Sequence, residues 1–373
     1  MRTILRWTGV LLVVCFLWVA VGYSYLFKGV YATYLHGKTT SNIHDRTHFE
    51  QALLPASSHP QPWPEALQPN DWKPSADVQA ALDSLETGAL LIAWKDTLRY
   101  ESYTSDVTPT SLTNSFSMGK SVVTLLTQMA IERGDIPSWD TKVKEYLPWI
   151  HGPGAKDLTL RHLSTMTATL DWDESYTNPL GVMARVYYNH SVEETMKTVE
   201  VGANPGVTYV YQSGATQLLA FCLESATGQT LPQLAGRDLW DPLGAEQDAT
   251  WHMDGEGKAL AYCCLNATAR DFARLGKLIL HQGSVNKKEI VDKEFIEMAT
   301  QPFKAEEYGH SFWLGKTSNG TPFSYFRGHL GQWIVTIPSL QLVAVRVGHF
   351  HGPSRGAHPR ALMKWLDQLV ALP

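Results

Sequence analysis

The chain has 373 residues, and its 31 Lys and Arg residues against 36 Asp and Glu residues give a formal net charge of −5. Hydrophobic residues make up 44% of the chain, and glycines and prolines are scattered, which excludes a disordered or fibrous protein. Basic residues form no long run, which excludes the electrostatic footprint of a nucleic-acid-binding protein. The four cysteines show neither a CxxC metal-binding pair nor the spacing of a disulfide framework.

The N-terminus carries a long apolar segment. Residues 8–27 are uncharged, and about 20 helical residues span the roughly 30 Å hydrocarbon core of a bilayer. Arg2 and Arg6 precede this segment and aromatic residues gather at its far end, which predicts a membrane anchor with the N-terminus inside. A signal peptide cleaved near residues 20–22 is the alternative. We assign residues 1–30 to an anchor or signal peptide and expect the rest of the chain outside the cytoplasm, in the periplasm or extracellular space.

The remaining chain divides into a tether and a folded domain. Residues 31–76 are Pro-rich and show no helical or strand periodicity, which predicts a tether. The domain is expected over residues 77–373, beginning with a helix over 77–86 and a strand pair over 88–103. Strand patterns return only late in the chain, over residues 310–316, 321–338 and 340–348. An amphipathic helix is expected after them, over residues 359–372.

The order of these elements predicts the fold class. Strands at both ends of the domain enclose a mainly helical stretch, residues 120–300, which favours an antiparallel sheet flanked by helices with a helical lobe beside it. The fold class is therefore α+β. A functional site is expected in the groove between sheet and lobe.

One tetrapeptide has the chemistry of a nucleophile and its base. Ser117 and Lys120 stand three residues apart at the start of an apolar helical run, so their side chains share a helix face. A lysine held neutral by burial could accept the serine proton. The same spacing recurs at Ser284 and Lys287 in a polar segment, where we interpret it as a surface loop.

Two further motifs follow in order, Tyr211-Gln212-Ser213 and His329-Leu330-Gly331. With Ser117–Lys120, their order and spacing resemble the SxxK, YxS and HxG motifs of serine hydrolases in the class C β-lactamase and penicillin-binding-protein superfamily. Within it, the chain is most similar to the esterase and 6-aminohexanoate-oligomer hydrolase branch. The resemblance covers about residues 77–370 and implies a β-lactamase/transpeptidase-like fold.

The resemblance also implies roles for individual residues. Ser117 would form an acyl-enzyme, with Lys120 and Tyr211 moving the proton. The backbone N–H groups of Ser117 and Gln332 would form the oxyanion hole. Residues expected to contact substrate or line the cleft are Ser213, Tyr176, His329 and Gly331. Arg327 would form a salt bridge or bind a substrate carboxylate.

No cofactor or metal is expected. His349, His351 and His358 lie close together in the sequence, but we interpret their segment as a polar loop. The sequence does not indicate an oligomeric state.

Two departures from the β-lactamase pattern bear on the substrate. Ser213 stands where β-lactamases usually have Asn, and His329-Leu330 stand in place of Lys-Thr, which helps recognise a β-lactam carboxylate. Leu330 cannot donate a hydrogen bond, so a β-lactam is disfavoured. The expected function is an exported serine hydrolase acting on a small amide or ester. The alternatives are a membrane-tethered, non-catalytic module that binds peptide or cell-wall fragments, and a weak β-lactamase or D-amino-acid peptidase.

Overall fold

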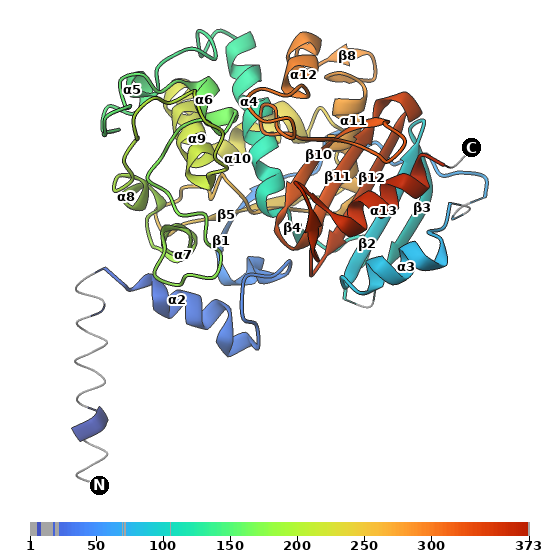
Figure 1. Ribbon diagram of the computed structural model, residues 1–373, viewed down its shortest axis with the longest axis horizontal. Helices are drawn as coiled ribbons and strands as arrows, with labels where there is room; N and C mark the ends of the chain where they lie inside the picture. The colour runs from blue at the N-terminus through green and yellow to red at the C-terminus, as the bar shows by residue number, and fades with distance from the viewer. Residues whose placement is uncertain are drawn as a thin grey trace.

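A six-stranded antiparallel sheet forms one side of the molecule (Figure 1). The computed structural model describes residues 6–8, 18, 22–68, 70, 72–104 and 106–371. The strand order is β3-β2-β12-β11-β10-β9, so early strands pair with late ones. The strands are β2 (Thr87–Trp94), β3 (Thr97–Tyr103), β9 (Trp313–Lys316), β10 (Pro322–Gly328), β11 (Gln332–Ile337) and β12 (Leu342–Gly348). This arrangement confirms the predicted α+β class, in which strands from both ends of the domain build one sheet.

Helices cover both faces of this sheet, which is why β2 and β12 are apolar along most of their length. Helices α3 (Ala76–Asp83) and α13 (Arg360–Leu369) pack on one face, where Leu82, Trp365 and Leu366 are buried in a core with Trp333. The other face packs against α11 (Ala269–Leu280) and joins the larger core. The bounds of α3 and α13 agree with those of the two predicted helices to within a few residues.

The helical lobe lies beside the sheet and shares this larger core (Figure 1). Its long helices α4 (Gly119–Glu132) and α9 (Ser213–Thr227) contact each other. The shorter helices are α5 (Val143–Tyr146), α6 (Leu160–Ser164), α7 (Val182–Tyr188), α8 (Val192–Met196), α10 (Leu231–Leu234) and α12 (Lys293–Ala299). Two short hairpins complete the periphery. One consists of β7 (Ser284–Val285) and β8 (Lys288–Glu289), and the other consists of β13 (Ser354–Arg355) and β14 (His358–Pro359).

The prediction that residues 31–76 form a tether is wrong. Strand β1 (Glu50–Leu54) pairs antiparallel with β5 (Ala249–Met253) in a second sheet, which also contains β4 (Thr113–Asn114) and β6 (Leu265–Ala267). Ile43, Phe49 and Trp63 are buried in the larger core. These apolar residues are too far apart to show a period, so their burial depends on contacts with residues distant in the sequence.

Helix α2 (Tyr25–Ala32) precedes this segment and packs against α7. Within the described residues, the structure contains no helix with the length and apolar character needed to cross a bilayer. Most of the predicted membrane span, residues 8–27, lies outside the described residues.

Candidate active site

Ser117 lies in a tight turn that leads into α4. The turn is a 3-10 segment, η3 (Phe116–Met118), and α4 begins at Gly119, two residues later than predicted. Phe116 has a φ of 45°, a conformation that costs energy in a non-glycine residue and that clusters at functional sites. The Asn114 side chain accepts a hydrogen bond from the Phe116 N–H at 2.8 Å and thereby holds this turn.

Lys120 and Ser117 share a helix face, as the three-residue spacing predicts. The Lys120 Nζ donates a hydrogen bond to Ser117 Oγ at 2.8 Å and another to the Tyr262 carbonyl at 2.9 Å. Lys120 is only 1% exposed, and this burial lowers the pKa of its amine to about 8. About a tenth of the amine is therefore neutral at pH 7, far more than for an ordinary lysine, and this neutral form can accept a proton.

Tyr211 places its ring against the same amine. Lys120 Nζ lies 5.0 Å from the centre of the Tyr211 ring. Burial raises the pKa of the Tyr211 hydroxyl, Glu174 adds to this increase, and the Ser117 hydroxyl partly offsets it. Tyr211 is therefore a proton donor in the resting site, whereas Lys120 has the lowered pKa of a base.

Glu174 connects the second motif to Tyr176. Its carboxylate accepts hydrogen bonds from the Ser213 hydroxyl at 2.5 Å, the Ser213 N–H at 2.7 Å and the Tyr176 hydroxyl at 2.6 Å. A fourth comes from the Trp172 indole N–H at 2.7 Å. Glu174 is not among the residues predicted from the sequence, although its position two residues before Tyr176 is an available signal.

The third motif forms the turn η5 (His329–Gly331) between β10 and β11. The His329 ring stacks on Tyr176 with 4.9 Å between ring centres. Burial, with smaller effects of His351 and Arg327, lowers the pKa of His329 to about 4, so the ring is uncharged at neutral pH. Gly331 is buried and has a φ of 85°, a conformation that favours glycine.

Gln332 is the first residue of β11, and its side chain points away from the pocket into the sheet. Its amide exchanges two hydrogen bonds with the backbone of Gly348, at 2.6 and 3.0 Å. The side chain thus fixes the end of β11 against β12.

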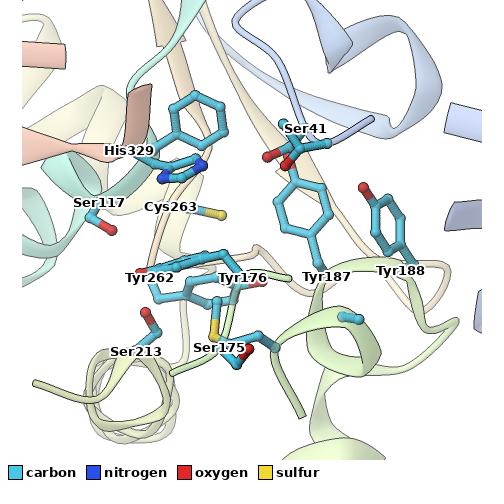
Figure 2. Close-up of a pocket in the computed structure, with 14 residues that line it drawn as sticks. Ser41, Ser117, Ser175, Tyr176, Tyr187, Tyr188, Ser213, Tyr262, Cys263 and His329 are labelled. Atoms are coloured by element: carbon cyan, nitrogen blue, oxygen red, sulfur yellow. The ribbon is translucent and has the colours of Figure 1, made fainter. Parts of the chain in front are cut away.

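A pocket joins these motifs (Figure 2). Ser117, Ser213 and His329 lie around one end, and Ser41, Tyr187 and Tyr188 lie at the other. The remaining lining residues are Thr40, Phe116, Ser175, Tyr176, Met183, Ala184, Tyr262 and Cys263. The α7 residues are not predicted from the sequence because they show only a core-like apolar pattern. Thr40 and Ser41 are not predicted because they lie in the supposed tether.

Three other features of the sequence have a place in the structure that differs from the three motifs. Ser284 belongs to the β7–β8 hairpin, as its interpretation as a surface loop requires. Arg327 donates to the Ala357 carbonyl at 2.6 Å and stacks on Trp313. Cys263 and Cys264 form a disulfide between adjacent residues, a pairing that the sequence analysis did not predict.

Comparisons with known proteins identify the family of the chain. Residues 76–364 match the family described as Beta-lactamase. The 6-aminohexanoate-dimer hydrolase of Paenarthrobacter ureafaciens is 23% identical over 312 residues, which cover 75% of this chain and 79% of that protein.

Two solved structures share the fold. A Bacillus anthracis protein provisionally named a 6-aminohexanoate-dimer hydrolase has a TM-score of 0.74 at 20% identity, covering 89% of this chain and 92% of its own. A family VIII carboxylesterase has a TM-score of 0.60 at 16% identity, covering 79% of this chain and 96% of its own.

The fold and the Ser–Lys pair define a serine hydrolase of the SxxK type. The chain belongs to the Beta-lactamase family, whose model matches most of its length.

Proposed function

We propose that this protein hydrolyses small, uncharged esters or linear amides through an acyl-enzyme on Ser117, outside the cytoplasm. The observation that carries the catalytic proposal is the 2.8 Å hydrogen bond between Ser117 Oγ and Lys120 Nζ, whose amine is buried and has a lowered pKa. A binding module without catalysis, the main alternative, has no need of such a pair.

The proposed mechanism assigns the proton to Lys120. Ser117 Oγ attacks the acyl carbon while the neutral Lys120 amine accepts the hydroxyl proton. The oxygen of the tetrahedral intermediate receives hydrogen bonds from the backbone N–H groups of Ser117 and Gln332. Tyr211, which keeps its proton in the resting site, donates it to the leaving group and recovers one from Lys120. Water then releases the acyl group by the same steps in reverse.

The lining of the pocket supports an uncharged substrate. Among its described lining residues, none has a carboxylate, ammonium or guanidinium group, and His329 is neutral at pH 7. Four tyrosines, Phe116 and Met183 are among the lining residues and give the pocket aromatic and apolar surface. The pocket volume of about 90 Å³ is small beside the roughly 300–1,000 Å³ of drug-sized sites, which favours a short acyl group. The relatives named as a 6-aminohexanoate-dimer hydrolase and a carboxylesterase support an amide or an ester.

Covalent labelling tests the catalytic proposal. A fluorophosphonate probe should modify the purified protein once, and peptide mapping by mass spectrometry should place the label on Ser117. Preincubation with a short-chain ester should slow the labelling. An unlabelled, folded protein would instead support the non-catalytic binding module.

The pH dependence of kcat/KM should reflect Lys120. Since the neutral amine is the base and burial lowers its pKa to about 8, kcat/KM should rise with pH and level off above about 8. Below that pH, the slope should be about tenfold per pH unit. Initial rates with a neutral ester, corrected for spontaneous hydrolysis, provide the measurement. A rate independent of pH between 6 and 9 would contradict Lys120 as the base.

We propose that Glu174 is a positioning residue. Two substitutions distinguish the effect of its charge from the effect of its hydrogen bonds. Glu174→Ala should lower kcat/KM by at least about tenfold, the effect of losing one charge-assisted hydrogen bond. Glu174→Gln can still accept from the Ser213 and Trp172 N–H groups, but it removes a charge that raises the pKa of Lys120. Its pH profile should therefore shift toward lower pH.

The neighbouring Asp173 is exposed and provides a matched control. Asp173→Asn should leave both kcat/KM and the pH profile unchanged. A pH profile that is unaltered in Glu174→Gln would show that Glu174 has only a structural role.

The location outside the cytoplasm rests on the N-terminal segment. At the C-terminal end of this segment, α2 and the following turn η1 (Tyr34–His36) expose the aromatic side chains of Phe27, Tyr31 and Tyr34. Exposed aromatic side chains favour the membrane interface. The full-length protein should sediment with membranes and be digested by protease added to intact cells. A chain lacking residues 1–21 should be soluble and retain activity. Protection of the domain in intact cells, with digestion only after lysis, would contradict this location.

A further inference from the structure

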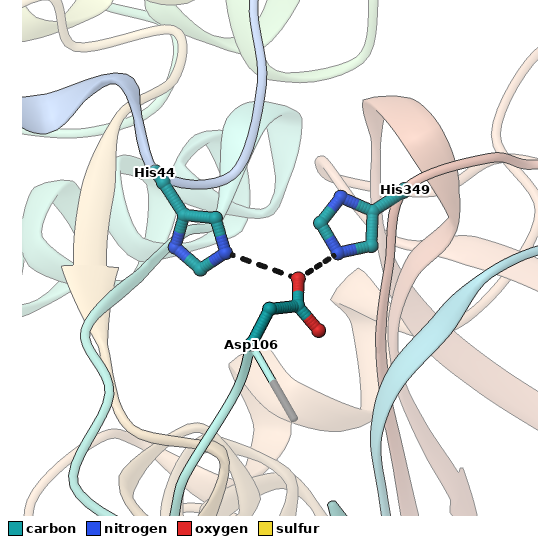
Figure 3. A group of neighbouring side chains, drawn as sticks. All are labelled: His44, Asp106 and His349. Carbon is teal, nitrogen blue, oxygen red and sulfur yellow. Dashed lines mark hydrogen bonds and ion pairs between the residues drawn. The ribbon is translucent and has the colours of Figure 1, made fainter. Parts of the chain in front are cut away.

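Three side chains from distant parts of the chain meet at the end of the six-stranded sheet (Figure 3). His44 lies in the N-terminal segment before β1, Asp106 follows β3, and His349 follows β12. The Nε2 atoms of both histidines point toward the same oxygen of Asp106, Oδ2, at 3.4 Å for His44 and 2.7 Å for His349. The catalytic proposal uses none of these residues.

The spacing of these atoms fits a small divalent cation. The possible ligand atoms all lie within 4.8 Å of one another. Ligand atoms of a tetrahedral zinc site with bonds of 2.0–2.1 Å are about 3.3 Å apart. The His44–Asp106 separation of 3.4 Å already matches this value, and the His349–Asp106 separation of 2.7 Å needs to widen by about 0.6 Å. The two histidine nitrogens, which lie within 4.8 Å of each other, need to close by at most about 1.5 Å.

Each residue is held in place by its surroundings. Asp106 Oδ1 accepts a hydrogen bond from the Thr104 hydroxyl at 2.6 Å, which leaves Oδ2 directed at the histidines. The backbone N–H of His349 donates a hydrogen bond to the Glu86 carbonyl at 3.1 Å. His44 stands between Ile43 and Asp45, which are both buried, so the backbone there is part of the packed domain. The backbone at His44 and at His349 is therefore anchored to the packed domain.

The local charge also favours a cation. A surface hollow beside His349 is lined by three carboxylates, those of Asp83, Glu86 and Asp106. Among the described residues that line it, Lys38 is the one lysine or arginine. The side chains of His44, Asp106 and His349 are 40%, 47% and 19% exposed, so an ion can reach them from solvent.

We propose that His44, Asp106 and His349 bind a divalent transition-metal ion, with two imidazole nitrogens and one carboxylate oxygen best suited to Zn²⁺. The ion would join the N-terminal segment to the ends of β3 and β12. Thr40 and Ser41 of this segment line the catalytic pocket, so the ion would stabilise one wall of that pocket without contacting the reacting groups. The proposal does not depend on which ester or amide is the substrate.

Metal binding to the untagged, chelator-treated protein tests the proposal. Titration with Zn²⁺ in a calorimeter should show one ion per chain with micromolar affinity or better, and Co²⁺ should give the visible absorption of a tetrahedral site. Zn²⁺ should raise the melting temperature by several degrees, because it binds only the folded state. His44→Ala and His349→Ala should each weaken binding by about 100-fold or more, beyond the roughly 10–100-fold effect of losing an outer partner.

A second histidine–aspartate pair provides the matched control. His281 Nε2 lies 2.8 Å from Asp96 but belongs to no cluster of three possible ligands among the described residues. His281→Ala should leave both affinity and metal-dependent melting unchanged. The proposal would be overturned if the wild type bound Zn²⁺ no better than the His44→Ala/His349→Ala variant, which would identify the cluster as histidine–carboxylate ion pairs alone. Because the readouts are binding and melting, this result would not affect the proposed hydrolase activity.

Discussion

Ser117→Ala should lower kcat by about 10⁴-fold or more and abolish labelling by a fluorophosphonate. The expected effect is this large because Ser117, Lys120 and Tyr211 act as a unit, and the nucleophile is the atom that forms the covalent bond. Ser117 is only partly buried and its loss leaves a small space, so the variant should fold normally. Initial rates with a short-chain ester, together with the melting temperature, provide the measurement.

Ser284→Ala is the control for this experiment because Ser284 and Lys287 have the same spacing in the sequence. They lie in the β7–β8 hairpin, where Lys287 is exposed and adopts a φ of 67° in the turn. The Ser284 variant should keep full activity. Full activity in Ser117→Ala, or its loss in Ser284→Ala, would show that the nucleophile has been assigned to the wrong residue.

Short-chain esters and linear amides should be hydrolysed with a kcat/KM at least tenfold to hundredfold above that of any penicillin or cephalosporin. A β-lactam brings a carboxylate that must lose water on entering the pocket, and this costs several kcal/mol without a strong donor. His329 is neutral there, and Arg327 is engaged by the Ala357 carbonyl and Trp313. The loss of one charge-assisted contact, about 1.5–3 kcal/mol, accounts for the expected factor.

His329→Lys should narrow this preference by supplying the missing cation. Leu330 is better left unchanged, since it is buried with a φ of 60°, a conformation that is strained for a β-branched threonine. Parallel kinetics with a chromogenic cephalosporin and a panel of neutral esters and amides provide the comparison. A wild-type protein that hydrolyses the cephalosporin faster than every ester and amide would assign it to the β-lactamases proper.

Local patterns determined much of the fold in advance. The alternation and length of the apolar segments predicted the strands of the six-stranded sheet, because strand and helix periods depend only on neighbours in the sequence. The three-residue spacing of Ser117 and Lys120 likewise predicted their contact, since such residues share a helix face. The order of the motifs then indicated the family.

The environment of these groups depends on contacts between distant parts of the chain. The lowered pKa values of Lys120 and His329 result from burial by residues far away in the chain, which no local pattern encodes. The same holds for Glu174, whose partners include Ser213, and for β1, which is a strand because β5 pairs with it. His44, Asp106 and His349 share no sequence motif at all. The identity of the reactive groups and the spacing of neighbouring ones are therefore predictable from local patterns, whereas the charge and the partners of these groups follow from long-range packing.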